Sequence, residues 1–186
     1  VDDVDTTITQ SQKYKGKTVR PACEIPNAGR MAVLTDPTNA VFAVWQCTTN
    51  TVSTNTQLPA SNTHGMWCWN ELMTSNVDVA GSYYINLFNW VPQLMEPRAS
   101  NITMFMQGNK PAASMMPIQK EWGNVSPHWL IYFSVDNCDT ALKTVTQSGG
   151  KAITQPQDIP NIGRFAVVQD PDGAVFGIIK MSKPSC

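Results

Sequence analysis

The chain has 186 residues, of which 42% are hydrophobic and only 15% are charged, and its formal net charge is −1. This length suggests one or two domains with enough apolar residues for a packed core, and a charge this close to zero argues against a nucleic acid or an anionic membrane surface as a partner. The longest apolar runs fall far short of the roughly 20 residues that a membrane-spanning helix needs. We therefore expect a globular protein that binds neither nucleic acid nor a membrane.

A segment in the first part of the chain recurs later at a fixed offset of 134 residues. PNAGRMAVLTDPTNAVFA, from Pro26, returns as PNIGRFAVVQDPDGAVFG, from Pro160, and eleven of the 18 positions are identical. A repeat this strict indicates one structural unit used twice. The second copy follows an apolar strand, whereas the first begins at Val1, so we expect a natural chain with about 75 further residues before Val1. The alternative is a homodimer in which a partner copy covers the exposed sheet edge.

Comparison of the two copies predicts three segments. Residues 1–47 are expected to form a β-α-β-β-β unit that lacks its first strand. Residues 48–63 (TTNTVSTNTQLPASNT) are almost wholly polar and are expected to form a linker. Residues 64–186 are expected to hold two complete units, 64–117 and 126–186.

The unit at 64–117 has a less regular pattern. Met66 to Thr74 is expected to be a strand, and the following apolar positions predict a helix from Val77 toward Phe88. Two strands with a hairpin turn at Gly108 and Asn109 complete the unit, and they are predicted over Ile102–Met106 and Ala112–Met116.

The unit at 126–186 is the clearest. Trp129 to Val135 predicts a strand, and Asn137 is among the residues expected to cap a helix that ends at Gly149 and Gly150. Asp170 to Gly173 predicts a tight turn. The remaining strands are expected over Lys151–Ile153, Phe165–Val168 and Ala174–Lys180.

Three stretches together carry a family resemblance. CWNELMTSNVDVAGSYYINLFNW, PHWLIYFSVDNCDTALK and GRFAVVQDPDGAVFGII resemble the vicinal oxygen chelate superfamily, which includes glyoxalase I, extradiol dioxygenases and the fosfomycin and bleomycin resistance proteins. Within this superfamily the chain resembles the bacterial two-domain glyoxalase-like proteins. The resemblance implies an α+β fold in which paired βαβββ units form a curved mixed sheet cup around the ligand. It also implies tandem domains, of which the first is incomplete in this chain.

The resemblance further implies a divalent metal held by His, Glu or Gln side chains. Counting from matching landmarks, the ligand positions fall on Trp69, Leu130 and Gly177, and on Ala43 in the first copy. None of these side chains can bind a divalent ion, so we expect no metal cofactor. A shifted metal site on Glu71 and His128 is the alternative, but it has two ligands where a catalytic zinc site usually has three from the protein.

Side chains at every second position of a strand point to the same face of the sheet. Residues two or four positions from the implied ligand positions are therefore also expected to line the cup. Aromatic walls with a few polar groups are typical of a small-molecule pocket, although aromatic side chains also fill cores, and both interpretations stay open. The candidate ligand-binding residues are Trp67, Trp69, Glu71, Met73, His128, Leu130, Tyr132 and Gly177.

Two other residue classes carry weaker signals. Arg30 and Arg164 recur in an Asn-x-Gly-Arg loop, where they either hook an anion or tie the loop to a carboxylate or carbonyl; the repetition favours the second role. Five widely spaced cysteines without a C-x-x-C pair indicate reduced thiols in a cytoplasmic protein.

The sequence contains no recognisable nucleophile–base constellation, so no catalytic residue is assigned. The favoured hypothesis is a glyoxalase-like protein that binds a small molecule without a metal. The alternatives are a metal-dependent lyase or dioxygenase with shifted ligands, and a non-catalytic structural or interaction protein whose cup is filled by its own side chains.

Overall fold

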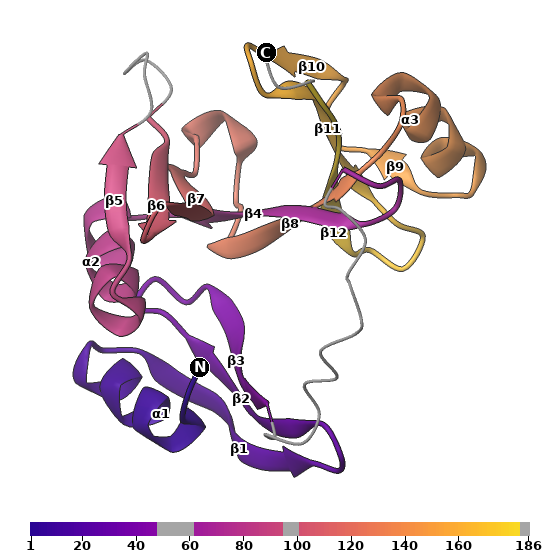
Figure 1. Cartoon of the computed structure of the whole chain (residues 1–186). Helices are drawn as coiled ribbons and strands as arrows, with labels where there is room; N and C mark the ends of the chain where they lie inside the picture. Colours follow the sequence, from indigo (N-terminus) through magenta and orange to yellow (C-terminus); the bar gives the residue numbers. More distant parts are fainter. Residues whose placement is uncertain (48–61, 95–100, 183–186) are drawn as a thin grey trace. The chain divides into compact units, whose positions relative to one another are not determined.

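The protein has an α+β fold (Figure 1), shown here as a computed structural model that describes residues 1–47, 62–94 and 101–182. The chain divides into two compact units, called unit 1 and unit 2 from here on, whose bounds differ from those of the β-α-β-β-β units of the repeat. Unit 1 consists of Val1–Thr56 and Glu71–Trp129, and unit 2 of Gln57–Asn70 and Leu130–Cys186. Nearly all of the predicted linker, residues 48–61, lies outside the described residues.

Unit 1 begins with a helix over a three-stranded antiparallel sheet of order β1-β2-β3. Asp3 caps the helix, because its side chain accepts a hydrogen bond from the backbone N–H of Thr6. One face of the sheet packs under the helix, where Val4, Leu34 and Val44 form a small core. The elements are α1 (Val4–Lys13), β1 (Lys17–Ile25), β2 (Gly29–Thr35) and β3 (Val41–Cys47).

Unit 1 continues with a second helix and a mixed sheet. The second half of β4 pairs parallel with β7, which pairs antiparallel with β6, and β6 in turn with β5. Asn76 caps the helix, and Asn89, in the left-handed conformation, ends it. The elements are β4 (Trp67–Thr74), α2 (Val77–Phe88), β5 (Val91–Leu94), β6 (Thr103–Gln107), β7 (Lys110–Pro117) and a 3-10 turn (Lys120–Trp122).

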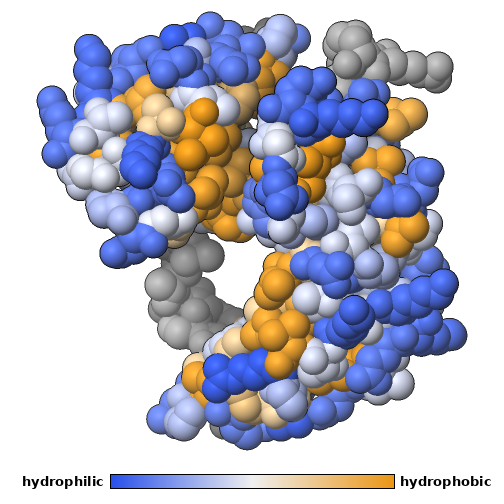
Figure 2. All heavy atoms as spheres, turned by 180° about the vertical axis from the view of Figure 1, so that it is seen from behind, coloured by the Kyte–Doolittle hydropathy of each residue, from blue (hydrophilic) through white to orange (hydrophobic). Residues whose placement is uncertain are grey.

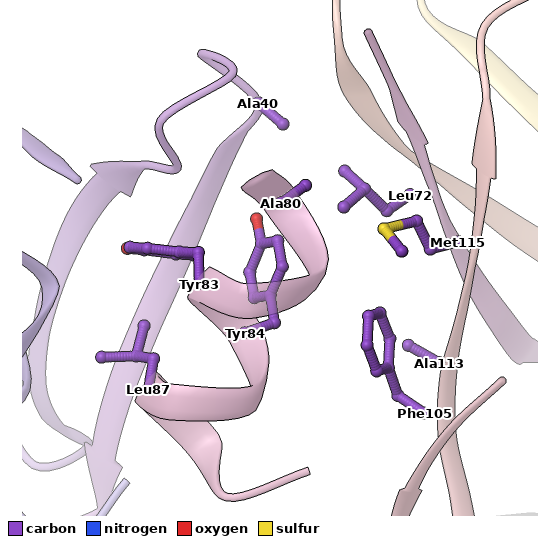
Figure 3. Packing of buried hydrophobic residues seen from close by; sticks show 9 residues of the cluster. All are labelled: Ala40, Leu72, Ala80, Tyr83, Tyr84, Leu87, Phe105, Ala113 and Met115. Atoms are coloured by element: carbon purple, nitrogen blue, oxygen red, sulfur yellow. The ribbon is translucent and has the colours of Figure 1, made fainter. Parts of the chain in front are cut away.

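Helix α2 contributes to the largest core of unit 1 (Figure 3). Tyr83 and Leu87 point to one side of the helix, and Leu72, Phe105 and Met115 lie on the other. All five side chains are buried. An apolar helix that packs on both sides explains why α2 is hydrophobic over most of its circumference.

Unit 2 is the second copy of the repeat together with most of the strand that precedes it and the first half of β4. Its strand order is β10-β11-β12-β8, and β9 pairs with the far end of β11. Asn137 caps the helix, as predicted, and the helix ends before Gly149. The elements are β8 (His128–Ser134), α3 (Cys138–Gln147), β9 (Lys151–Ala152), β10 (Gln157–Ile159), β11 (Gly163–Gln169) and β12 (Val175–Met181).

The structure confirms the predicted elements and adds two short strands, β5 and β10. Neither has an alternating apolar pattern: β5 is exposed at all four positions and contains Pro92, and β10 has only three residues. No helix among the described residues is long and apolar enough to cross a membrane.

Candidate ligand-binding site

The eight predicted pocket residues lie on three strands, and the division into units separates them. Unit 2 holds Trp67 and Trp69 on β4, Leu130 and Tyr132 on β8, and Gly177 on β12. Unit 1 holds Glu71 and Met73 on β4 and His128 at the start of β8.

In unit 2, the ring of Tyr132 covers Gly177. The two residues are partners in the parallel pairing of β8 with β12. A Cβ atom added at Gly177 would lie 2.2 Å from Cδ1 and 2.4 Å from Cε1 of Tyr132. The phenol ring thus occupies the space that any longer side chain at position 177 would need.

Further contacts pack residue 132 against its neighbours in unit 2. Tyr132 and Leu130 are buried, and the ring of Phe165 on β11 lies 6.3 Å from that of Tyr132, centroid to centroid. The Cys68 thiol on β4 donates a hydrogen bond to the Tyr132 carbonyl, and burial raises the pKa of that thiol. Position 132 is therefore part of a packed layer.

The two tryptophans of β4 are more open than Tyr132. Trp67 is 52% exposed, and Trp69 is half-buried. Adjacent aromatic side chains that remain open to solvent can stack on a planar ligand. They are the part of the predicted set in unit 2 that a ligand can reach.

In unit 1, Glu71 is buried and accepts a hydrogen bond from the Ser114 hydroxyl at 3.0 Å. The two residues are partners across β4 and β7, and Met73 is buried two positions further along. Nδ1 of His128 lies 2.8 Å from the Ser126 carbonyl. Because a carbonyl can only accept, Nδ1 is the donor in this hydrogen bond.

These residues do not fit a divalent metal. At the implied ligand positions the side chains of Trp69 and Leu130 have no suitable donor atom, and Gly177 lies under the ring of Tyr132. Over the three described stretches, no group of three or more His, Cys, Asp or Glu side chains is arranged to hold an ion.

Two hollows in unit 1 were not predicted from the sequence. One, of about 230 Å³, lies between α2 and the sheet and includes Gly81, Phe105 and Met115. The other, of about 440 Å³, lies between the end of α1 and α2 and includes Tyr14 and Tyr83. The one feature of the sequence that could have pointed to the first hollow is Gly81, a small residue inside a predicted helix. In the structure, a Cβ atom at this position would lie 3.3 Å from Cε of Met115.

Unit 1 also contains two buried tyrosines on α2. The Tyr83 hydroxyl is hydrogen-bonded to Ser11 on α1 at 2.7 Å, and that of Tyr84 accepts from Trp129 Nε1 at 3.0 Å. Burial raises the pKa of Tyr83 to about 12 and that of Tyr84 well above its ordinary value. Both phenols stay protonated at neutral pH and act as hydrogen-bonding groups of the core.

Arg30 and Arg164 have the structural role that the repeat favoured. Arg30 binds both carboxylate oxygens of Asp5 and one of Glu24. Arg164, 134 residues later, binds Asp139 and Asp158 in the same way. Each arginine ties its strand to its helix through charge-assisted hydrogen bonds.

The fold of this chain and the strands that carry the predicted pocket residues belong to a region that matches one protein family. The model of the glyoxalase/bleomycin resistance protein/dioxygenase superfamily matches residues 68–178. The chain belongs to this superfamily, which confirms the resemblance inferred from the sequence.

Two relatives are similar to nearly the whole of this chain. CFP32 of Mycobacterium tuberculosis, whose name places it among glyoxylases, is 35% identical over 181 residues, which cover 97% of this chain and 67% of that protein. The anthracycline biosynthesis protein DnrV of Streptomyces peucetius is 28% identical over 180 residues, 97% of this chain and 63% of that protein. The chain thus spans about two thirds of the length of these relatives.

A solved structure supports the fold alone. The 2,3-dioxygenase LapB from Pseudomonas sp. KL28 superposes with a TM-score of 0.61 at 13% identity, over 98% of this chain and 69% of that one. At this identity the similarity concerns the path of the chain and not its chemistry.

Proposed function

We propose that this glyoxalase-like domain binds a planar aromatic or electrophilic metabolite without the help of a divalent metal. The observation that carries the proposal is the ring of Tyr132 against Gly177, because it fills the space of a ligand side chain that metal-binding members of the family would place there. The exposed ring of Trp67 and the half-buried ring of Trp69 supply an apolar surface suited to a flat molecule. The similarity to a protein of anthracycline biosynthesis agrees with a planar, polycyclic class of ligand.

Tryptophan fluorescence tests the proposal directly. The protein, stripped of metal with EDTA, is titrated with a panel of planar aromatic compounds, an anthracycline among them, and of small electrophilic aldehydes. We expect saturable quenching that Trp67→Phe and Trp69→Phe weaken. Trp122→Phe is the matched control, because Trp122 is similarly exposed but lies outside the predicted set. A flat response across the whole panel would contradict ligand binding.

Metal loading separates the proposal from a metal-dependent enzyme. The protein is incubated with zinc, nickel, manganese or iron(II), desalted and analysed for metal content. The proposal expects substoichiometric metal and unchanged ligand affinity. One bound metal per chain that is lost in both Glu71→Gln and His128→Gln would instead establish the shifted site, since each variant removes one of its two proposed ligands.

The second candidate function is a non-catalytic role in which the protein's own side chains fill the cup. The burial of Leu130 and Tyr132 favours it. In that case the domain serves as a structural or interaction module. Tyr132→Ala distinguishes the two: opening space at Gly177 should create a new binding response in a filled cup, whereas an existing site built on Trp67 and Trp69 responds before the substitution is made.

A further inference from the structure

The larger hollow of unit 1, of about 440 Å³, lies between the end of α1 and the first turns of α2. Small-molecule pockets usually measure roughly 300 to 1,000 Å³, so a compact organic ligand fits this space. Lys13, Tyr14 and Lys15 form its border on the side of α1, and Val79 and Ser82 lie on the side of α2. No residue of the predicted cup is among the described residues that line it, so the hollow is a different site.

The repeat shows how this border differs from the equivalent place in the second copy. The sequence KYK at 13–15 corresponds, 134 residues later, to QSG at 147–149. The neighbouring turn is the same in both copies, since Pro37 lines the hollow and Pro171 lies 3.7 Å from a Cβ atom added at Gly149. The first copy thus carries two positive charges and an aromatic ring on a scaffold that holds none of them in the second.

Lys15 has a backbone conformation that favours glycine. Its φ is 69°, in the left-handed region, and Gly149 at the equivalent position has a φ of 87°. A glycine ends a helix in this conformation without the steric conflict that a Cβ atom brings, so lysine lowers the stability here relative to glycine. Residues held in such conformations gather at functional sites. The lysine therefore indicates a role of its side chain beyond folding.

A buried hydrogen bond holds the floor of the hollow. The Tyr83 ring lines it, and the Tyr83 hydroxyl is hydrogen-bonded to Ser11 at 2.7 Å. Gly16 lets the chain pass close to this hydrogen bond, because a Cβ atom at Gly16 would collide with both hydroxyl oxygens. Tyr14 is half-buried and packs against the core of unit 1. A site whose walls are already ordered loses less conformational entropy when a ligand binds.

The charges around the hollow favour an anion. The surface of the first copy is mostly hydrophilic, as the lower part of Figure 2 shows, and both lysines are exposed on it. Neither lysine forms a salt bridge within the three stretches that the structure describes. The Lys13 ammonium lies 5.7 Å from the centre of the Tyr14 ring, so a positive charge lies beside an aromatic surface. Asp78, in the first turn of α2, is the one acidic side chain among the described lining residues.

We propose that this hollow binds an aromatic carboxylate. The carboxylate group meets the ammonium groups of Lys13 and Lys15, and the ring lies against Tyr14 and the exposed Val79. A flat ring suits this place, because paired aromatic rings gain free energy beyond the burial of their area. The ligand carries its negative charge at one end, since Asp78 repels a second charge on the side of α2.

The first test is a titration with 1-naphthoate, followed through the backbone amide chemical shifts in NMR spectra. The protein carries Trp67→Phe and Trp69→Phe, so that the aromatic surface on β4 contributes little to binding. We expect saturable shifts at the amides of Lys15, Gly16 and Val79. 1-Naphthamide, which has the same ring without the charge, should bind about tenfold more weakly. Unmoved amides at these three positions at millimolar 1-naphthoate would overturn the proposal.

The second test restores the residues of the second copy. Lys13→Gln combined with Lys15→Gly should weaken 1-naphthoate binding by about tenfold, because two exposed charge pairs are lost. Lys15→Gly alone should raise the melting temperature, since glycine relieves the left-handed position, so weaker binding does not come from unfolding. Asp78→Asn should strengthen binding, because it removes a like charge from the border.

The matched control is Lys17→Gln combined with Arg20→Gln. These exposed residues follow the same helix and are not among the described residues that line the hollow, yet the double variant removes the same charge. We expect it to leave the affinity for 1-naphthoate unchanged. An equal loss in both double variants would overturn the proposal, because net charge alone would then attract the ligand. Unchanged affinity in Lys13→Gln with Lys15→Gly would overturn it as well.

Discussion

The two copies of the repeat share turn chemistry but differ in what surrounds it. In the first, one carboxylate oxygen of Asp36 accepts from the backbone N–H groups of Thr38 and Ala40. In the second, Asp170 binds the equivalent Asp172 and Ala174. Yet Asp36 is only 1% exposed and Asp170 is half-buried. The same local structure serves as part of a core in one place and as a surface turn in the other.

Substitutions within the turn explain the difference. Thr38 carries a hydroxyl that accepts from Thr74 on β4, and Asp172 stands in its place in the second copy. On the helices, Ser11 is buried against the Tyr83 hydroxyl, whereas the equivalent Val145 packs in an apolar core. The first copy is therefore adapted to contact β4 and α2 of unit 1 through small polar side chains.

The largest expected difference between the copies is at the turn aspartate. Asp36→Ala leaves the backbone donors of Thr38 and Ala40 buried without an acceptor, and we expect it to lower the free energy of unfolding by about 4 kcal/mol. Asp170→Ala should cost about 1 kcal/mol, because water replaces the carboxylate at the surface. Urea unfolding followed by circular dichroism measures both, and equal losses would show that burial does not distinguish the turns.

The loop glycines should behave alike in both copies. Gly29 and Gly163 have φ values of 156° and 153°, and an added Cβ would lie 2.2 Å and 2.3 Å from the carbonyl oxygens of Gln46 and Lys180. We expect Gly29→Ala and Gly163→Ala each to lower stability by about 2 to 3 kcal/mol. Gly108→Ala is the control, at about 1 kcal/mol, because φ is positive there and the space is open. Unequal costs for the first two would mean that the loops are not equivalent.

Much of this fold could be predicted from the sequence because the pattern repeats. The cap at Asn137, the turn at Asp170 and the helix from Val77 follow from local chemistry, and the structure confirms each of them. The two short strands could not be predicted, since β5 and β10 form only through their pairing with β6 and β11. The burial of Asp36 was equally hidden, because the dipeptide Asp-Pro is identical in both turns.

The candidate site was predictable only in part. Counting from landmarks identified Gly177 as a position without a metal ligand, but it could not show that the ring of Tyr132 fills the space. That contact depends on the register of two strands 45 residues apart. Nor did the sequence indicate the hydrogen bond between the Tyr83 hydroxyl and Ser11 on α1, because the two residues are 72 positions apart.

Alkaline pH should destabilise the contact that is special to the first copy. Burial raises the pKa of Tyr83 from 10.0 to about 12, so the native state holds the phenolic proton more tightly than the unfolded state. The resulting stability is complete below pH 10 and is lost as the pH rises toward 12, by about 2 kcal/mol. Thermal unfolding across this range measures the loss, and Tyr83→Phe should reduce it by the share of Tyr83, whereas Tyr84, whose pKa burial also raises, keeps its own share. Ser11→Ala should move the window to higher pH, because the Ser11 hydrogen bond lowers the pKa.

The smallest effect is expected at the paired arginines, and here the copies should again agree. Arg30 and Arg164 each bind both oxygens of a helix aspartate, but the carboxylate partners are mostly exposed, so water and salt screen the attraction. Lysine keeps the charge and loses the two-pronged geometry, so Arg30→Lys and Arg164→Lys should cause equal and slight decreases in melting temperature that high salt removes. Melting curves at low and high ionic strength measure this. A salt-resistant loss confined to Arg30→Lys would instead mean that this pair, like Asp36, belongs to the buried contact with α2, and the difference between the copies would then extend from the turn to the opposite end of the sheet.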